Sequence, residues 1–206
     1  MIVFADNDIL LKLAGCNLLN DYLDLIAAKP GDIFLNPEAR YSLPKQAKKK
    51  IGREADIRGL MDVIGGANEA PPVQSLDLLD RLSATVDTGE AHLLASACEQ
   101  AGQWRIASGD KRAFVALLEN NAILQEVVNA VSGRLYTLEM ALLLLLDQKG
   151  FEYTAHAVSA RSVSDSVLGM AFGAGRTKEH AIDCLSSNTR QLLPLLAHPH
   201  LVAPAP

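Results

Sequence analysis

Three acidic residues stand where a folded chain can bring carboxylates together. Asp6 follows the apolar run 2–5, Asp110 closes a short turn after the run 104–107, and Glu90 precedes a stretch of small apolar residues. Carboxylates held close together repel one another unless they are protonated or share a cation, and hard oxygen ligands suit Mg²⁺ or Mn²⁺. Such an ion can activate water and steady a phosphoryl oxygen, so this pattern favours metal-dependent hydrolysis of a phosphate ester.

The elements that would position these acids alternate between strand and helix. Alternation of this kind predicts an α/β fold with a mostly parallel sheet of four or five short strands, whose right-handed crossovers bring the carboxyl strand ends to one edge. Ligands of such sheets bind at that edge. Asp6 and Asp110 would meet there, with Glu90 at the start of a helix. We expect strands at 2–4, 33–35, 104–107 and 135–137, and one near Val73.

Composition indicates the setting in which the protein works. The 206-residue chain is 49% hydrophobic and 21% charged, with a net charge of -5, which is typical of an ordered globular protein and argues against a surface that coats nucleic acid as a whole. The longest apolar run, 140–146, is too short to span a bilayer, and no export leader is visible. Cys16, Cys98 and Cys184 fit neither a disulfide framework nor a CxxC metal site. We therefore expect a cytoplasmic protein that does not associate with membranes.

Three short segments resemble the PIN domain family of metal-dependent ribonucleases, which includes VapC-like toxins. Ile-Val-Phe-Ala-Asp-Asn-Asp at 2–8 resembles the opening of a PIN domain. Asp-Thr-Gly-Glu-Ala at 87–91 resembles the segment that begins a helix with an acid, and Ile-Ala-Ser-Gly-Asp at 106–110 resembles a strand end that supplies a metal-binding aspartate. The segments follow the family's order over residues 1–140. This implies a PIN-like three-layer α/β/α domain.

The resemblance also implies an activity and a set of site residues. Asp6, Glu90 and Asp110 are expected to be the catalytic and metal-binding residues, holding Mg²⁺ or Mn²⁺ in an endoribonuclease that hydrolyses RNA phosphodiester bonds. Such an enzyme could be a toxin with an antitoxin protein as its partner. The supporting residues expected nearby are Asn7, Asp8, Asp87, Ser108, Lys111 and Glu139.

One position departs from the family pattern. In many PIN nucleases the helix after the second strand carries an inward glutamate, whereas here Ser42 lies in that region and Glu38 comes too early to replace it. If Ser42 occupies that place, metal affinity is weakened, unless another acid such as Glu139 compensates. The alternative is a catalytically degenerate PIN-like module that binds RNA or a protein, because a fold does not guarantee activity.

A third interpretation assigns the acids no ligand at all. Acids at helix starts are favoured by the helix dipole, so the three carboxylates could simply cap helices in a structural protein. We expect residues 141–206 to form a C-terminal helical extension packed on the same domain. Its apolar stripes could complete the core, form a homo-oligomer or contact a partner.

Basic residues gather in two places. Lys111 and Arg112 follow Asp110 so closely that they could contact a scissile phosphate or merely neutralise the acids. The denser stretch could attract RNA phosphates, or it could be a solvated helix face. The residues of this stretch that we consider for RNA binding are Lys45, Lys48, Lys49, Lys50 and Arg53.

Overall fold

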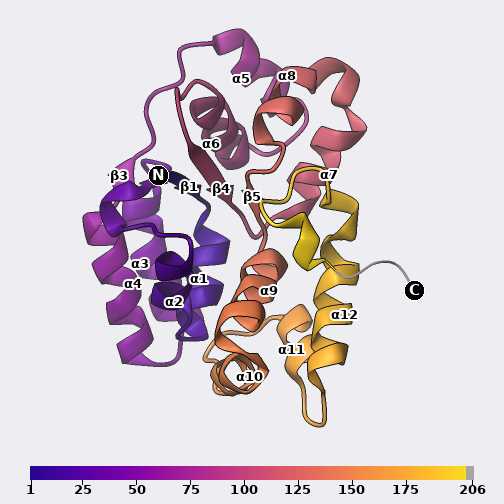
Figure 1. The fold of residues 1–206 in the computed structure, drawn as a ribbon. Coiled ribbons are helices and arrows are strands. Elements are labelled where there is room, and N and C mark those ends of the chain that lie inside the picture. Colours follow the sequence, from indigo (N-terminus) through magenta and orange to yellow (C-terminus); the bar gives the residue numbers. More distant parts are fainter. Residues whose placement is uncertain (203–206) are drawn as a thin grey trace.

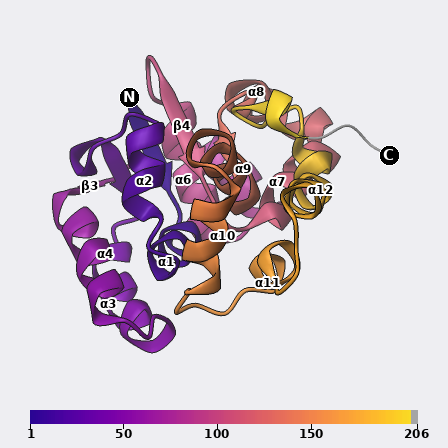
Figure 2. The same cartoon turned by 60° about the horizontal axis from the view of Figure 1, so that its bottom comes forward.

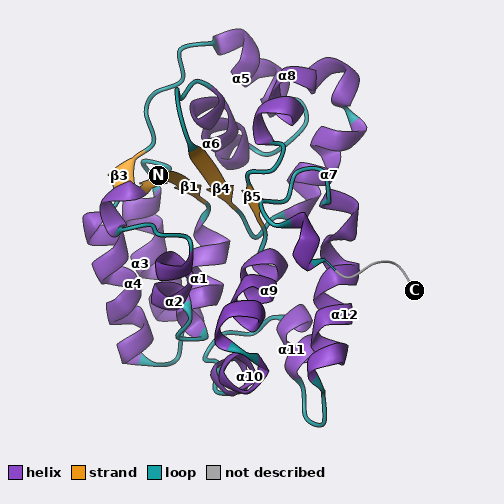
Figure 3. Cartoon of the chain, in the orientation of Figure 1, coloured by secondary structure: helices purple, strands orange, loops and turns teal. Residues whose placement is uncertain are grey.

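The computed structural model describes residues 1–202 of the chain. Its centre is one sheet of five strands, all parallel, in the order β3-β2-β1-β4-β5 (Figures 1 and 3). This confirms the expected α/β class and the parallel sheet. The strands are β1 (Ile2–Ala5), β2 (Ile33–Leu35), β3 (Asn68–Glu69), β4 (Trp104–Ala107) and β5 (Leu135–Tyr136).

The two central strands, β1 and β4, determine where a ligand can bind. Both are short, mostly apolar segments with most residues buried, as expected for strands covered on both faces. Ala5 pairs with Ala107, so the two strands end at the same level. The chain continues from β1 through β2 to β3 on one side, and from β4 to β5 on the other. The gap beyond β1 and β4 is therefore the switch point of the sheet, where parallel α/β proteins bind ligands.

Helices cover both faces of the sheet, which agrees with the expected three layers. In Figure 1, α1, α2 and α9 lie on one side and α5, α6 and α8 on the other. Figure 2 shows α3 and α4 side by side next to α1, with α7 and α12 at the opposite end. The helices of this part of the chain are α1 (Asn7–Gly15), α2 (Leu19–Leu25), α3 (Ala39–Lys50), α4 (Glu54–Gly66), α5 (Leu76–Ser83), α6 (Thr88–Cys98), α7 (Lys111–Glu119), α8 (Asn121–Val131) and α9 (Leu138–Lys149).

The prediction of a strand near Val73 was wrong. The third strand is β3, which ends at Glu69, and the next residue, Ala70, donates its N–H to the carbonyl oxygen of Leu35 at 2.7 Å. Pairing cannot continue, because the prolines that follow at 71–72 have no N–H to donate to a ladder. Val73 lies beyond them in an irregular segment.

The C-terminal residues pack on the same body. They form α10 (Phe151–Ser159), α11 (Ser166–Phe172), α12 (Lys178–Thr189) and short 3₁₀ turns. Leu135 of β5 bonds to the carbonyl of Leu195 and to the N–H of Ala197, each at 2.9 Å, so the chain end shields an edge strand. The division expected at residue 140 would fall inside α9 and stays a prediction, and residues 203–206 of the extension lie outside the described residues. Within residues 1–202, no helix combines the length and apolar character needed to cross a bilayer.

Candidate functional site

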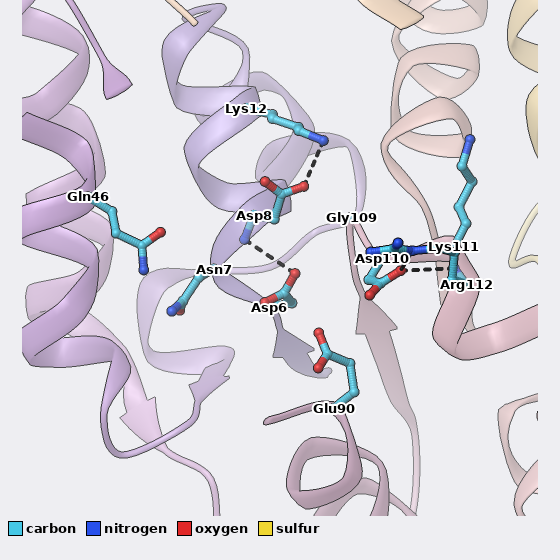
Figure 4. A pocket seen from close by; sticks show the side chains of 10 residues that line it. All are labelled: Asp6, Asn7, Asp8, Lys12, Gln46, Glu90, Gly109, Asp110, Lys111 and Arg112. Atoms are coloured by element: carbon cyan, nitrogen blue, oxygen red, sulfur yellow. Dashed lines mark hydrogen bonds and ion pairs between the residues drawn. The ribbon is translucent and has the colours of Figure 1, made fainter. Parts of the chain in front are cut away.

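An open cavity of about 670 Å³ lies beyond the carboxyl ends of β1 and β4. It receives Asp6 from the end of β1, Glu90 from the first turn of α6, and Asp110 from the start of α7. The three acids expected from the sequence thus share one cavity, although their roles stay predictions. The lining residues, drawn in Figure 4, are Asp6, Asn7, Asp8, Lys12, Gln46, Glu90, Gly109, Asp110, Lys111 and Arg112.

The closest acidic group differs from the expected trio in one member. Asp87, Glu90 and Asp110 each offer a carboxylate oxygen within 4.8 Å of the others. Asp6 is not part of this group, because its side chain turns back to cap α1, where Oδ2 accepts a hydrogen bond from the N–H of Asp8 at 3.3 Å. Asp87, expected only as a supporting residue, is the third member of this group in place of Asp6.

Helix capping accounts for part of this arrangement. Asp110 accepts a hydrogen bond from the N–H of Arg112 at 2.9 Å, and Asp87 accepts one from the N–H of Glu90 at 3.5 Å. Both aspartates are therefore N-caps, a position that satisfies helix donors left without partners. Glu90 lies in the first turn instead, and its carboxylate points into the cavity (Figure 4). Because a carboxylate has about four acceptor positions, a cap still leaves oxygen lone pairs free for a cation.

Burial makes the charged form of Asp6 unfavourable. It raises the pKa of the Asp6 carboxyl above its ordinary value, and the nearby charge of Asp8 raises it further. Hydrogen bonds from backbone N–H groups, that of Asp8 foremost, oppose this shift without cancelling it. A cation in the cavity would favour the charged form, so proton loss from Asp6 and cation binding would assist each other.

We expect Asp6→Asn to stabilise the metal-free protein near neutral pH. Because the folded-state pKa of Asp6 is raised, protonation of this carboxyl favours the folded state. That stabilisation is fully present below the ordinary pKa of 3.8 and is lost as the pH rises through the folded-state pKa. Asparagine keeps an oxygen for the helix cap but carries no charge. Melting temperatures are measured from pH 3 to pH 8 in chelator. The melting temperature of the variant should rise relative to that of the wild type as the pH increases. A difference that is the same at every pH would contradict this expectation.

The side of α3 that faces the cavity carries neutral side chains. Asn7 donates from Nδ2 to Ser42 Oγ at 3.2 Å, so Ser42 faces the site from α3. One turn later, Gln46 lines the cavity with its amide (Figure 4). Glu38 lies in a separate hollow of the surface and does not line the cavity. On this side of the cavity, α3 therefore offers a hydroxyl and an amide but no carboxylate.

Glu139, considered as an acid that could compensate, does not line the cavity. Its side chain is 3% exposed and accepts a hydrogen bond from Lys111 Nζ at 2.5 Å. Lys111 also donates to the carbonyl oxygen of Asn188 at 3.1 Å and points away from Asp110 (Figure 4). Arg112 stays beside Asp110, with Nε 3.6 Å from Oδ1, and its side chain is 94% exposed. Of the two basic residues considered for a phosphate contact, only Arg112 is free to make one.

An ammonium group that sequence reasoning missed ties the site to the C-terminal helices. Lys12 Nζ lies 2.7 Å from Asp8 Oδ2 and 2.9 Å from Oδ2 of Asp165, the N-cap of α11. Burial lowers the pKa of Lys12, but the bonds to both carboxylates outweigh it and leave this pKa raised. Burial alone would raise the pKa of Asp165, but Lys12 holds it below its ordinary value. The i,i+4 spacing of Asp8 and Lys12 was the only signal in the sequence.

Gly109 gives Asp8 the space it occupies. A Cβ at position 109 would lie 2.3 Å from Asp8 Oδ2 and 3.1 Å from Asp8 Cβ. We expect Gly109→Ala to lower the free energy of unfolding by about 1–3 kcal/mol, as overpacking does. Asp8→Ala in the same chain should restore most of this loss, because it removes most of the clashing atoms. Urea unfolding of the single and double variants measures both effects.

Gly65→Ala is the matched control for this prediction. Gly65 lies in α4, and a Cβ there would meet nothing within 4 Å. Alanine should therefore be neutral or stabilising at position 65, since it favours a helix over glycine. A Gly109→Ala chain as stable as the control would contradict the steric argument.

Comparisons with known proteins identify no family for this chain. No protein-family model, curated protein or solved structure matches it. The resemblance to PIN domains rests on the three sequence segments, and any assignment of function rests on the geometry of the cavity.

The basic residues expected to bind RNA divide into two groups. Lys45, Lys48 and Lys49 are exposed on α3. Lys50 is also exposed and donates to Gln46 at 3.4 Å, whereas Arg53 Nε bonds to Asp56 Oδ2 at 2.8 Å.

Ser108, expected as a supporting residue, is buried and accepts a hydrogen bond from the N–H of Asp110 at 3.0 Å, which steadies the turn before α7.

Proposed function

We propose that this protein is a metal-dependent endoribonuclease of the PIN type that hydrolyses RNA phosphodiester bonds. The observation that supports it best is the arrival of Asp6, Glu90 and Asp110 in one open cavity at the switch point of a parallel sheet. Every acidic donor is a hard carboxylate oxygen, which suits Mg²⁺ or Mn²⁺. Such an ion would activate water and offset charge on a phosphoryl oxygen.

The charged residues in and beside the cavity have distinct parts in this proposal. Glu90 and Asp110 would hold the ion, with Asp87 and Asp6 as further oxygen ligands. Arg112, exposed beside Asp110, would contact the scissile phosphate, because a guanidinium can form two parallel hydrogen bonds to a phosphate. Lys12 neutralises Asp8 and so lowers the repulsion that an incoming phosphate would meet.

RNA cleavage tests the proposal directly. Labelled single-stranded RNA is incubated with the wild type and with Asp110→Asn, in Mg²⁺, in Mn²⁺ and in chelator. We expect the wild type to cleave only with a metal ion and the variant to lose cleavage, since asparagine keeps the helix cap and removes the charge. Failure of both proteins to cleave, with circular dichroism showing both folded, would overturn the nuclease proposal.

A second candidate function is a catalytically degenerate PIN-like module that binds RNA or a protein. It is favoured by Ser42 and Gln46, which present no charge on the wall where many PIN nucleases carry a glutamate. Ser42→Glu distinguishes the two functions. In a degenerate module the added carboxylate should create or strongly increase metal-dependent cleavage, whereas an enzyme that is already active should change far less.

The cellular role forms part of the same proposal. As a VapC-like toxin, the protein would act in the cytoplasm and be restrained by an antitoxin protein. Three cysteines without disulfide partners are consistent with that reducing compartment. Overexpression should then arrest growth, and Asp110→Asn should remove the arrest. Normal growth with active wild-type enzyme would exclude the toxin role and leave the nuclease.

A further inference from the structure

We propose that Tyr41 and the hollow around it form a binding subsite for an unpaired nucleobase beside the carboxylate cavity. The subsite rests on the proposed ribonuclease function for its ligand, and it assigns to Tyr41 a role that none of the cavity residues has. The ring of Tyr41 would stack on one base while the sugar-phosphate chain continues toward Asp110.

The exposure and surroundings of Tyr41 fit a stacking surface. Its side chain is 75% exposed, and no large apolar side chain in residues 1–202 is more exposed. Tyr41 lines a shallow, open hollow of about 320 Å³ together with Glu38, Ser42 and Lys45. An aromatic face that is open to solvent can accept a flat ring.

The hollow adjoins the proposed cleavage site. Ser42 lines the hollow and also bonds through Oγ to Asn7, which lines the carboxylate cavity beside Asp6. Gln46, one turn further along α3, faces the cavity in Figure 4. The edge of α3 that carries Ser42 thus separates the hollow from the cavity, and a strand crossing this edge would reach both.

Charge around Tyr41 favours a base in the hollow and phosphates outside it. Lys45 and Lys48 follow at i+4 and i+7, so they lie on the same side of α3 as Tyr41, and both are exposed. Glu38 would repel a phosphate from the hollow, but it can accept a hydrogen bond from an amino group on a base edge. An aromatic ring combined with nearby cations is the usual means of binding single strands, whereas a duplex keeps its bases stacked.

Binding without cleavage tests the subsite. Fluorescence anisotropy with a labelled single-stranded RNA octamer, in chelator, gives the dissociation constants of the wild type and its variants. Tyr41→Leu should weaken binding about 10-fold or more, the size expected for one lost base stack. Tyr41→Phe should bind like the wild type. The control is Tyr153→Leu, because Tyr153 is a tyrosine of α10 that is 48% exposed and whose hydroxyl bonds to Asp21, away from the cavity, and this variant should leave RNA binding unchanged.

Abasic and duplex probes identify the part of RNA that Tyr41 contacts. With an octamer of abasic ribose phosphates, or with double-stranded RNA, Tyr41→Leu and the wild type should bind equally. Three results would overturn the subsite. The wild type and Tyr41→Leu could bind the normal octamer equally, Tyr41→Leu could lose as much affinity for the abasic octamer as for the normal one, or the wild type could fail to bind the normal octamer. Cleavage of RNA without Tyr41-dependent binding would support the nuclease proposal and overturn the subsite. Tyr41-dependent binding without cleavage would support the subsite and overturn the nuclease proposal.

Discussion

Glu90→Gln is expected to lower the rate of metal-dependent RNA cleavage by about 10²–10³-fold, the size expected when one group that stabilises transition-state charge is removed. Glutamine keeps the length and shape of the side chain, and the backbone N–H of Glu90 keeps its bond to Asp87. Only the charge that points into the cavity is lost. Single-turnover cleavage at saturating Mg²⁺ or Mn²⁺ measures the rate, and a metal titration measures the shift in the concentration needed for half-maximal activity.

Two further variants make this prediction specific. Glu119→Gln changes an exposed acid at the far end of α7, and it should leave the rate unchanged. The double variant Glu90→Gln/Asp110→Asn should be little slower than the slower single variant, because residues that act on one ion are not additive. Losses that multiply would contradict a shared ion, and an unchanged rate in Glu90→Gln would remove Glu90 from the site.

The sheet could be predicted from the sequence wherever its strands carry apolar runs. β1, β2, β4 and β5 each bury such a run, and their positions follow from it. β3 could not be found in this way, because Asn68 and Glu69 are both exposed. Its place is determined by tertiary contacts, among them the bond from Asn68 Nδ2 to the carbonyl oxygen of Gly31 at 2.7 Å.

The candidate site shows the same limit at the level of side chains. Topology alone brings Asp6, Glu90 and Asp110 to one edge, because it depends only on parallel strands and right-handed crossovers. The direction of each side chain depends on neighbours from distant segments. Lys12 meets Asp165 in this way, and no local pattern announces that pair.

Lys111 is the clearest case of a side chain whose role depends on a distant segment. Its place next to Asp110 suggested a phosphate contact, but the fold puts Glu139 of α9 and the carbonyl of Asn188 of α12 within its reach. Because β4 and β5 are neighbours in the sheet, the helices that follow them start side by side. The ammonium therefore links the start of α7 to the C-terminal helices.

Lys111→Met is expected to lower the free energy of unfolding by about 3 kcal/mol, at the lower end of the range for one broken buried ion pair because Lys111 is 22% exposed. The loss arises because Glu139, 3% exposed, is left buried without its counter-charge. Urea unfolding measures it. Arg112→Met is the matched control. The Arg112 side chain is the sequence neighbour of Lys111 and is 94% exposed, so its replacement should change the free energy of unfolding by no more than about 0.5 kcal/mol.

The double variant Lys111→Met/Glu139→Met decides whether the buried charge is the cause. Two apolar side chains of similar volume should recover most of the lost stability, because replacing a whole buried ion pair is often neutral. A double variant as unstable as Lys111→Met would assign the loss to the contact with Asn188 instead. Recovery would mean that the loss in Lys111→Met arises from the charge of Glu139, which is left buried without a counter-charge.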